Sequence, residues 1–218
     1  MPQSAQLAPT PFLDWQHPAI LELAARVADA ASPVEKATRL FLIVRDEVVY
    51  DPYTASFDPE QLTASATWTR KRGFCVTKAL LYAAALRAVG IPSRVGFADV
   101  VNHLATTRLL EMMRTEVFVF HGSTDAWLGG RWVKSTPAFD RRLCARFGVA
   151  PLEFDGVNDS LLQPHNGKGA RFMEYRVDHG SFDDFPFEQM LAAWRATYPH
   201  FFEGVGVEEL RGDFARET

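Results

Sequence analysis

The apolar segment at residues 74–89, FCVTKALLYAAALRAV, constrains the fold more than any other part of the chain. Most of its residues favour a helix, and its apolar side chains occur on most faces instead of along one stripe. Gly90 follows, where a glycine commonly ends a helix. Because a helix that is apolar on most faces must be covered on most faces, this segment is predicted to be a central, buried helix.

The segments around this helix predict an α+β fold. Upstream, apolar periodicity predicts amphipathic helices at 18–31 and 34–50, and a short helix at 62–68. Downstream, the pattern predicts strands at 95–101, 152–164 and 171–180, a β-hairpin over 116–139 that turns at Gly129-Gly130, and helices at 104–113, 140–149 and 187–202. This order predicts a single domain over residues 1–218, with helices packed on a mostly antiparallel sheet and a core at about 35–140.

Composition limits the classes of partner. The 218 residues are 47% hydrophobic and carry a formal net charge of −4, with no long run of Lys or Arg. Nucleic acid and an anionic membrane surface are therefore not expected as partners. No stretch approaches the roughly 20 apolar residues of a membrane span, and the first residues lack a signal-peptide pattern, so a cytoplasmic location is expected.

The two cysteines, Cys75 and Cys144, predict free thiols and not a disulfide framework. No CxxC or HExxH spacing occurs, so no metal and no cofactor is expected. Cys144 has no glycine corner before it and is predicted to be a packing residue.

Cys75 is the candidate nucleophile, because it stands at the predicted start of the central helix. Unpaired backbone N–H groups and the helix dipole lower the pKa of a thiol at such a place, and the charges of Lys71 and Arg72 are expected to act in the same direction. Gly73 permits the backbone turn, and the N–H groups there could form an oxyanion hole. The alternative is a buried packing cysteine, since free cysteines are among the most buried residues.

A cysteine nucleophile needs a base, and His121 is the histidine that a strand would hold rigidly. His103 and His179 could each line a pocket or cap a turn. The other three histidines are expected to be solvated: His17, His165 and His200.

Two blocks of sequence can be taken together. GFC at 73–75 is followed by LRAVGIPSR and VGF, and His121 is followed by Asp125, the glycine pair and Trp132. In this order they resemble the transglutaminase-like superfamily of cysteine enzymes over roughly residues 35–140. The runs GFADVVNHL and FHGSTDAWLGGRWVKSTPAF are similar to a bacterial subgroup of stand-alone members. The resemblance implies a papain-like fold in which the cysteine helix packs on a sheet carrying His121 and its partner.

The sequence departs from this family at the third catalytic position, where Thr136 replaces the usual aspartate. If Gly129-Gly130 is the hairpin turn, the strand ladder makes Thr136 and Asp140 the diagonal neighbours of His121. The Asp140 carboxylate could stabilise an imidazolium ion, whereas the Thr136 hydroxyl could only orient the ring. Asp140 is preferred as the third catalytic residue, with Thr136 as the alternative.

Four further residues are candidates for contact with the substrate or the oxyanion. Trp68 could wall the site or pack in the core, and Phe74 adjoins Cys75. Asn102 and His103 could donate to a bound acyl group or form a turn. Asp125 is expected to be a solvated hairpin residue.

These residues predict an enzyme that acts on a peptide, amide or small acyl substrate through a Cys75 thioester. Hydrolysis of a peptide or amide bond is the preferred reaction. The alternatives are an acyltransferase or cyclase that forms an amide on a small or carrier-bound substrate, and a non-catalytic peptide-binding module.

Overall fold

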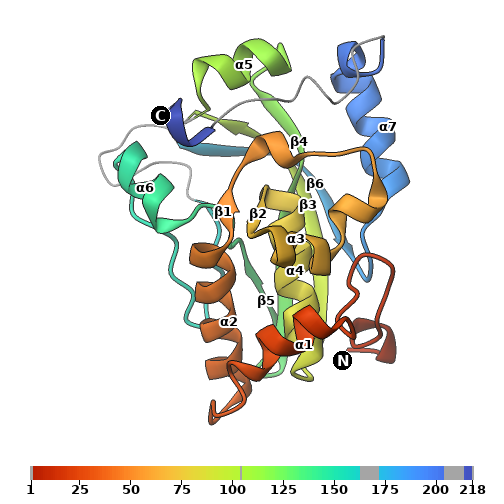
Figure 1. Ribbon diagram of the computed structural model, residues 1–218, viewed down its shortest axis with the longest axis vertical. Coiled ribbons are helices and arrows are strands. Elements are labelled where there is room, and N and C mark those ends of the chain that lie inside the picture. Colours follow the sequence, from red (N-terminus) through yellow and green to blue (C-terminus); the bar gives the residue numbers. More distant parts are fainter. Residues whose placement is uncertain (1, 104, 163–171, 204–213, 218) are drawn as a thin grey trace.

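The computed structural model describes residues 2–103, 105–162, 172–203 and 214–217. Its main sheet has four antiparallel strands in the order β5-β4-β3-β6. They are β3 (Ser93–Asn102), β4 (Val117–Leu128), β5 (Arg131–Ser135) and β6 (Met173–Phe182). A second, parallel pair joins β1 (Val49–Tyr50) to β2 (Arg72–Gly73). The predicted α+β fold is therefore confirmed, with the helices packed on a mostly antiparallel sheet (Figure 1).

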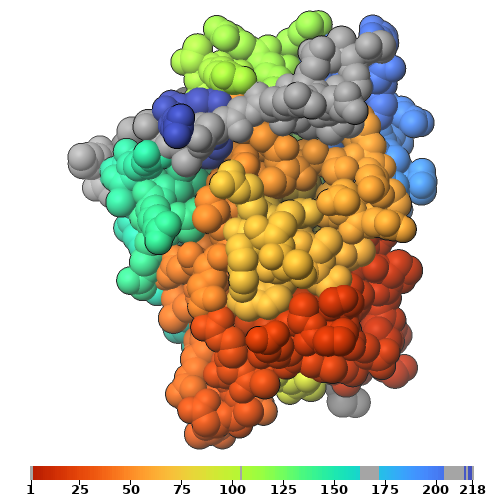
Figure 2. All heavy atoms as spheres, in the orientation of Figure 1, coloured from red at the N-terminus to blue at the C-terminus, as the bar shows by residue number. Residues whose placement is uncertain are grey.

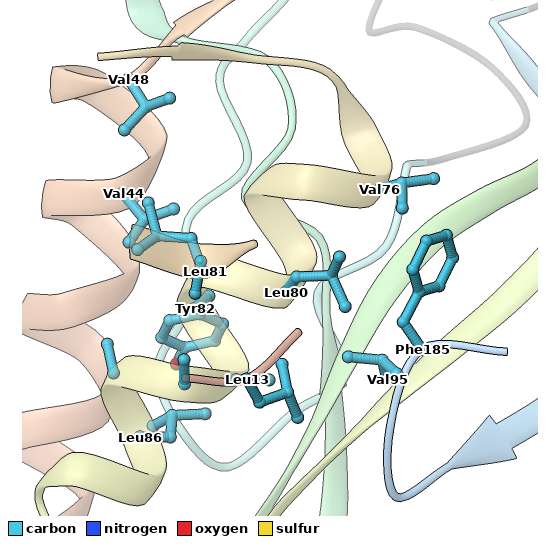
Figure 3. Packing of buried hydrophobic residues seen from close by; sticks show 14 of the residues in the cluster. Leu13, Val44, Val48, Val76, Leu80, Leu81, Tyr82, Leu86, Val95 and Phe185 are labelled. Atoms are coloured by element: carbon cyan, nitrogen blue, oxygen red, sulfur yellow. The ribbon is translucent and has the colours of Figure 1, made fainter. Parts of the chain in front are cut away.

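Helix α4 (Cys75–Ala88) is the central element. It contacts β3 and β4 of the sheet and also three N-terminal helices: α1 (Pro18–Ala25), α2 (Pro33–Glu47) and α3 (Ala64–Arg70). Figure 3 shows Leu81 beside Val44 of α2, while Val76 and Leu80 lie toward Phe185 and the sheet. All residues from 76 to 87 are buried, which confirms the predicted central helix.

The other helices lie around this core (Figure 1). They are α5 (Thr107–Met113), α6 (Arg141–Phe147) and α7 (Phe187–Thr197), and short 3₁₀ turns occur at Ser4–Gln6, Pro52–Thr54, Pro59–Leu62, Pro199–Phe201 and Phe214–Arg216. The N-terminal segment, red and orange in Figure 2, forms the lower part of the visible face. No helix in the described ranges has the length and apolar character needed to cross a membrane.

Three predicted elements differ from the structure. Helix α1 ends at Ala25 because the next residues tighten into i→i−3 hydrogen bonds, such as Val27 N–H to the Ala24 carbonyl. Residues 49–50 leave the predicted second helix and form β1, in keeping with their β-forming side chains.

The third difference is that residues 152–162 contain no strand, apart from a single bridge between Ser135 and Ser160. Asp155 turns the chain there, because its Oδ1 accepts the N–H groups of Val157 and Asn158. The rest of that predicted strand, 163–164, and His165 lie outside the described residues.

Lys78 is a fully buried side chain that connects α4 to the end of α2. Its Nζ donates to the backbone carbonyls of Arg45 at 2.9 Å and Val48 at 2.5 Å. Both carbonyls lie at the C-terminal end of α2, where carbonyl groups generally lack donors within the helix, so Lys78 takes the place of a cap. Burial lowers the pKa of Lys78 to about 7.

Replacing Lys78 with methionine is expected to reduce the free energy of unfolding by about 2–4 kcal/mol, because two buried carbonyls lose their donor. Since the pKa of Lys78 is lower in the folded state, its contribution to stability rises as the pH increases from about 7 to 10.5. Urea unfolding at pH 7 and pH 9 measures both effects, with Lys36→Met on α2 as the control. An unchanged free energy of unfolding would show that the two carbonyls do not need Lys78.

Candidate active site

The backbone around Cys75 is fixed by a corner between β2 and α4. Gly73 pairs with Tyr50 of β1, and the next residue, Phe74, donates its N–H to Thr77 Oγ1 at 3.2 Å. A Cβ at Gly73 would lie 2.6 Å from that same oxygen, so a larger residue would displace the hydroxyl that holds this corner. The corner places Cys75 as the first residue of α4, as predicted from the sequence.

The strand that carries His121 touches this corner at Gly122. A Cβ on Gly122 would lie 2.8 Å from Val76 Cα and 2.9 Å from the Cys75 carbonyl oxygen. Side chains are therefore excluded at position 122, and the β4 backbone itself contacts the start of α4. The Gly122 N–H acts on the sulfur of Cys75 and favours its thiolate form.

Adding a methyl group at position 122 is expected to separate β4 from α4. Gly122→Ala should lower the free energy of unfolding by about 1–3 kcal/mol, because the added Cβ meets backbone atoms that cannot rotate away. Chemical denaturation measures this loss, and Ser123→Ala at the next position of β4 is the matched control. Equal stability of the two variants would contradict the close approach at Gly122.

Burial governs the ionisation of both candidate catalytic groups. It raises the pKa of the Cys75 thiol to about 11, although the N–H groups of Gly122, Val76 and Cys75 oppose this rise. Burial likewise lowers the pKa of His121 to about 4. The low thiol pKa predicted from the helix start is therefore wrong, because removal from water outweighs the backbone dipoles. At neutral pH the pair consists of a thiol and a neutral imidazole.

The two cations upstream of Cys75 have other partners. Lys71 lies over the ring of Trp68, and Arg72 forms an ion pair of 2.8 Å with Asp51. Neither cation contributes to the shift in the pKa of Cys75, so the prediction that they lower it is also wrong.

Cys75 and His121 line the same cavity, whose volume is about 80 Å³. The cavity lies between the start of α4 and residues of β3, β4, α5 and α7, and aromatic and aliphatic side chains form nearly all of its wall. No hydrogen bond joins the Cys75 sulfur to His121, and within the described ranges the His121 Nε2 is buried without a partner.

His121 also borders a second cavity of about 340 Å³. Polar and charged residues contribute to its wall, including Ser123, Lys134, Arg176 and Asp178. His121 thus stands where an apolar and a more polar cavity meet. Within the described part of the chain, no group of three or more His, Cys, Asp or Glu side chains could hold a metal ion.

A bulge in β4 lies directly before His121, opposite Asp99 of β3. Phe120 has φ of 58°, a left-handed conformation that is strained for a side chain of this size. Asp99 holds it, because its Oδ1 accepts both the Phe120 N–H at 3.0 Å and a hydrogen bond with His179 Nε2 at 2.7 Å. The His179 ring also stacks on Phe120, with centroids 4.5 Å apart. His179 therefore supports the backbone next to His121.

Neither predicted third residue forms a hydrogen bond with His121. The Asp140 carboxylate caps α6, because Oδ1 accepts the N–H groups of Arg142 and Leu143, and Oδ2 accepts that of Tyr50. Three donors occupy the two oxygens, so Asp140 acts as a structural cap in this conformation instead of a partner for the imidazole.

The predicted hairpin register is confirmed from Leu128–Arg131 to Thr124–Ser135, where the ladder ends. Thr136 then leaves β4, and its N–H donates to the Ser160 carbonyl at 3.0 Å. Its Oγ1 is buried with no hydrogen-bond partner in the described ranges. No carboxylate has replaced the missing aspartate at this position.

The four predicted substrate contacts fall into two groups. Phe74 and Asn102 line the cavity of Cys75. Trp68 is 7% exposed, packs in the main core and is not part of the cavity wall. His103 is also outside the wall and forms an ion pair of 2.8 Å with Glu174.

Asp125 corrects another expectation, because it is buried and not solvated. Its carboxylate contacts Arg94 and Lys134 and accepts a hydrogen bond from Ser181 at 2.6 Å. It therefore connects β4 to β3, β5 and β6. Cys144 is buried and unpaired, which confirms that it is a packing residue.

The sequence did not reveal the aromatic wall supplied by distant segments. Trp194, Tyr198, Phe201 and Phe214 all line the cavity of Cys75. The amphipathic pattern at 187–202 indicated a helix with a buried face, but not which part of the core that face would cover.

Comparisons with known proteins identify a family for this chain. The model of a family described as the transglutaminase-like superfamily matches residues 21–137. A similar solved structure is that of a "Putative Cysteine Protease from Cytophaga hutchinsonii", at 19% identity and a TM-score of 0.49. The match covers 82% of this chain and 46% of that one, so the chain spans less than half the length of that protein. No curated protein matches the sequence.

Proposed function

Because the chain belongs to the transglutaminase-like superfamily, we propose that it hydrolyses a peptide or amide bond through a thioester on Cys75. The observation that carries this proposal is the shared cavity of Cys75 and His121, at the place where Gly122 brings β4 against the start of α4. A nucleophile and a base on separate, rigid elements next to one cavity are the parts that acyl transfer requires.

The ionisation of the pair defines the first step. His121 is neutral above pH 4 and can take the thiol proton as the sulfur bonds to the substrate carbonyl carbon. Negative charge then develops on the carbonyl oxygen, and the backbone N–H groups near Cys75 are suited to stabilise it.

The second step releases the amine. The bond between carbon and nitrogen breaks, His121 gives its proton to the departing nitrogen, and the acyl group remains as a thioester. The position of His121 at the edge of the second, more polar cavity supports this role, because that side offers room for an amine. Water then attacks the thioester, which returns the free thiol and a carboxylic acid.

The test uses p-nitrophenyl butyrate, an activated acyl compound, followed by the 4-nitroanilide of the same acid. The expected result is a burst of p-nitrophenolate, a butyryl group on Cys75 in the intact mass spectrum, and slower release of nitroaniline from the amide. Cys75→Ala should abolish all three signals. Cys144→Ala is the matched control, because it removes the other free thiol.

A non-catalytic peptide-binding module is the second candidate. It is favoured by the high pKa of the Cys75 thiol and by Thr136 in place of an aspartate. If neither ester nor amide acylates Cys75 under conditions where the fold is intact, the protein is a peptide-binding module and not an enzyme. If butyrate forms slowly but an added amine is acylated rapidly, the reaction is acyl transfer instead of hydrolysis.

A further inference from the structure

We infer that the acyl part of the substrate is a compact, uncharged apolar group of about four or five carbon atoms, which occupies the cavity at Cys75. This inference rests on the proposed function, because it places the occupant of the cavity on the thioester carbon.

The chemistry of the cavity wall excludes charged acyl groups. Apart from Cys75, His121 and tyrosines, no residue in the described wall is ionisable, and Asn102 is the one amide side chain. The hydroxyl of Tyr198 is already used, because it donates to the Val117 carbonyl and accepts the Val119 N–H, both at 2.9 Å. A carboxylate or ammonium group on the acyl chain would lose its water here and meet no opposite charge in the described wall. Apart from His121, the one buried donor there without a partner in the described ranges is the Trp194 Nε1–H, which is neutral.

Apolar acyl groups gain binding energy from contact with the same wall. Met112 and Met113 of α5 and aromatic rings from α7 and the C-terminal turn line this space. Methionine side chains adapt to irregular apolar ligands, and each buried methylene is worth about a fourfold gain in binding.

The volume limits the length of the acyl group. The cavity measures about 80 Å³, and an engineered apolar cavity of roughly 150 Å³ admits benzene. About half of that volume suits a butyryl or isovaleryl group better than a long fatty acyl chain.

The experiment measures the rate of the first acylation for p-nitrophenyl esters of acetic, butyric, succinic and decanoic acids. In each case the Cys75 sulfur bonds to the carbonyl carbon, the ester C–O bond breaks to release p-nitrophenolate, and the thiol proton passes through His121 to solvent. We expect butyryl to react about tenfold faster than acetyl. Succinyl, which is close to butyryl in length but charged, should react at least tenfold more slowly than acetyl.

Variants of α5 test whether the cavity causes this preference. Met112→Trp fills the cavity and should remove the advantage of butyryl over acetyl, whereas Met112→Ala should shift the optimum to a longer chain. Glu111→Trp is the matched control, because residue 111 is exposed on the same helix and lies outside the wall. It should keep the wild-type preference.

The outcomes separate this inference from the proposed function. If acetyl, butyryl and succinyl esters acylate Cys75 at equal rates, the cavity does not select the acyl group and the inference fails, while the thioester mechanism stands. A preference for the decanoyl ester would also contradict the inference that the acyl group is compact. If none of the esters acylates Cys75, both proposals fail together.

Discussion

Replacing His121 with glutamine is expected to lower the rate of Cys75 acylation by about 10²–10⁴-fold. Glutamine can form hydrogen bonds in a similar volume, but it cannot take a proton from the thiol. The effect should be large because the thiol has a pKa of about 11, so very little thiolate exists at neutral pH without a base. The burst of p-nitrophenolate from p-nitrophenyl butyrate measures the rate, and thermal unfolding confirms that the variant is folded.

His103→Gln is the matched control for this experiment. His103 is paired with Glu174 outside the cavity, so its replacement should change the rate less than about twofold. If His121→Gln reacted within tenfold of the wild type, His121 would not be the base. If His103→Gln were instead the slow variant, this result would support the prediction that His103 contacts the acyl group.

The central helix and the hairpin could be predicted because each depends on local pattern. Residues 74–89 are apolar on most faces, and Gly129-Gly130 provides the positive φ angles that a two-residue turn requires. These two elements also hold Cys75 and His121, so the places of both residues in the fold could be predicted without a structure. The strand expected at 152–164 was wrong in its described part because Asp155 forms a local turn.

The surroundings of the two residues depend on contacts between distant segments, and sequence patterns do not reveal these. The local argument for a low thiol pKa counted the start of α4 but not the aromatic wall that shields the partly buried Cys75 from much of the water. Asp140 carried a signal that was available, because an aspartate directly before a helix is a common N-cap. This N-cap signal predicts the role that Asp140 has in the structure, whereas continuing the hairpin ladder beyond Ser135 did not.

The pH dependence of Cys75 alkylation is the second prediction with a large effect. Iodoacetamide reacts with the thiolate, and an ordinary cysteine has a pKa of about 8.5. With its pKa raised to about 11, Cys75 should react at pH 7.5 about 300-fold more slowly than an exposed thiol. Its rate should then rise about tenfold per pH unit until the pH approaches 11. The measurement uses the Cys144→Ala background, so that Cys75 is the one thiol present.

This profile separates two ways of activating the nucleophile. A preformed thiolate–imidazolium pair would give fast alkylation that changes little between pH 5 and pH 8, and that result would contradict the burial described above. Slow alkylation of Cys75 together with its rapid acylation by p-nitrophenyl butyrate would indicate the second way of activation. It requires His121 to remove the thiol proton only as the sulfur bonds to the substrate, since the pKa of its own ring is about 4 and it remains neutral until then. In such a mechanism the imidazolium forms only in the transition state, so the free enzyme holds no ion pair that a carboxylate at position 136 would have to stabilise.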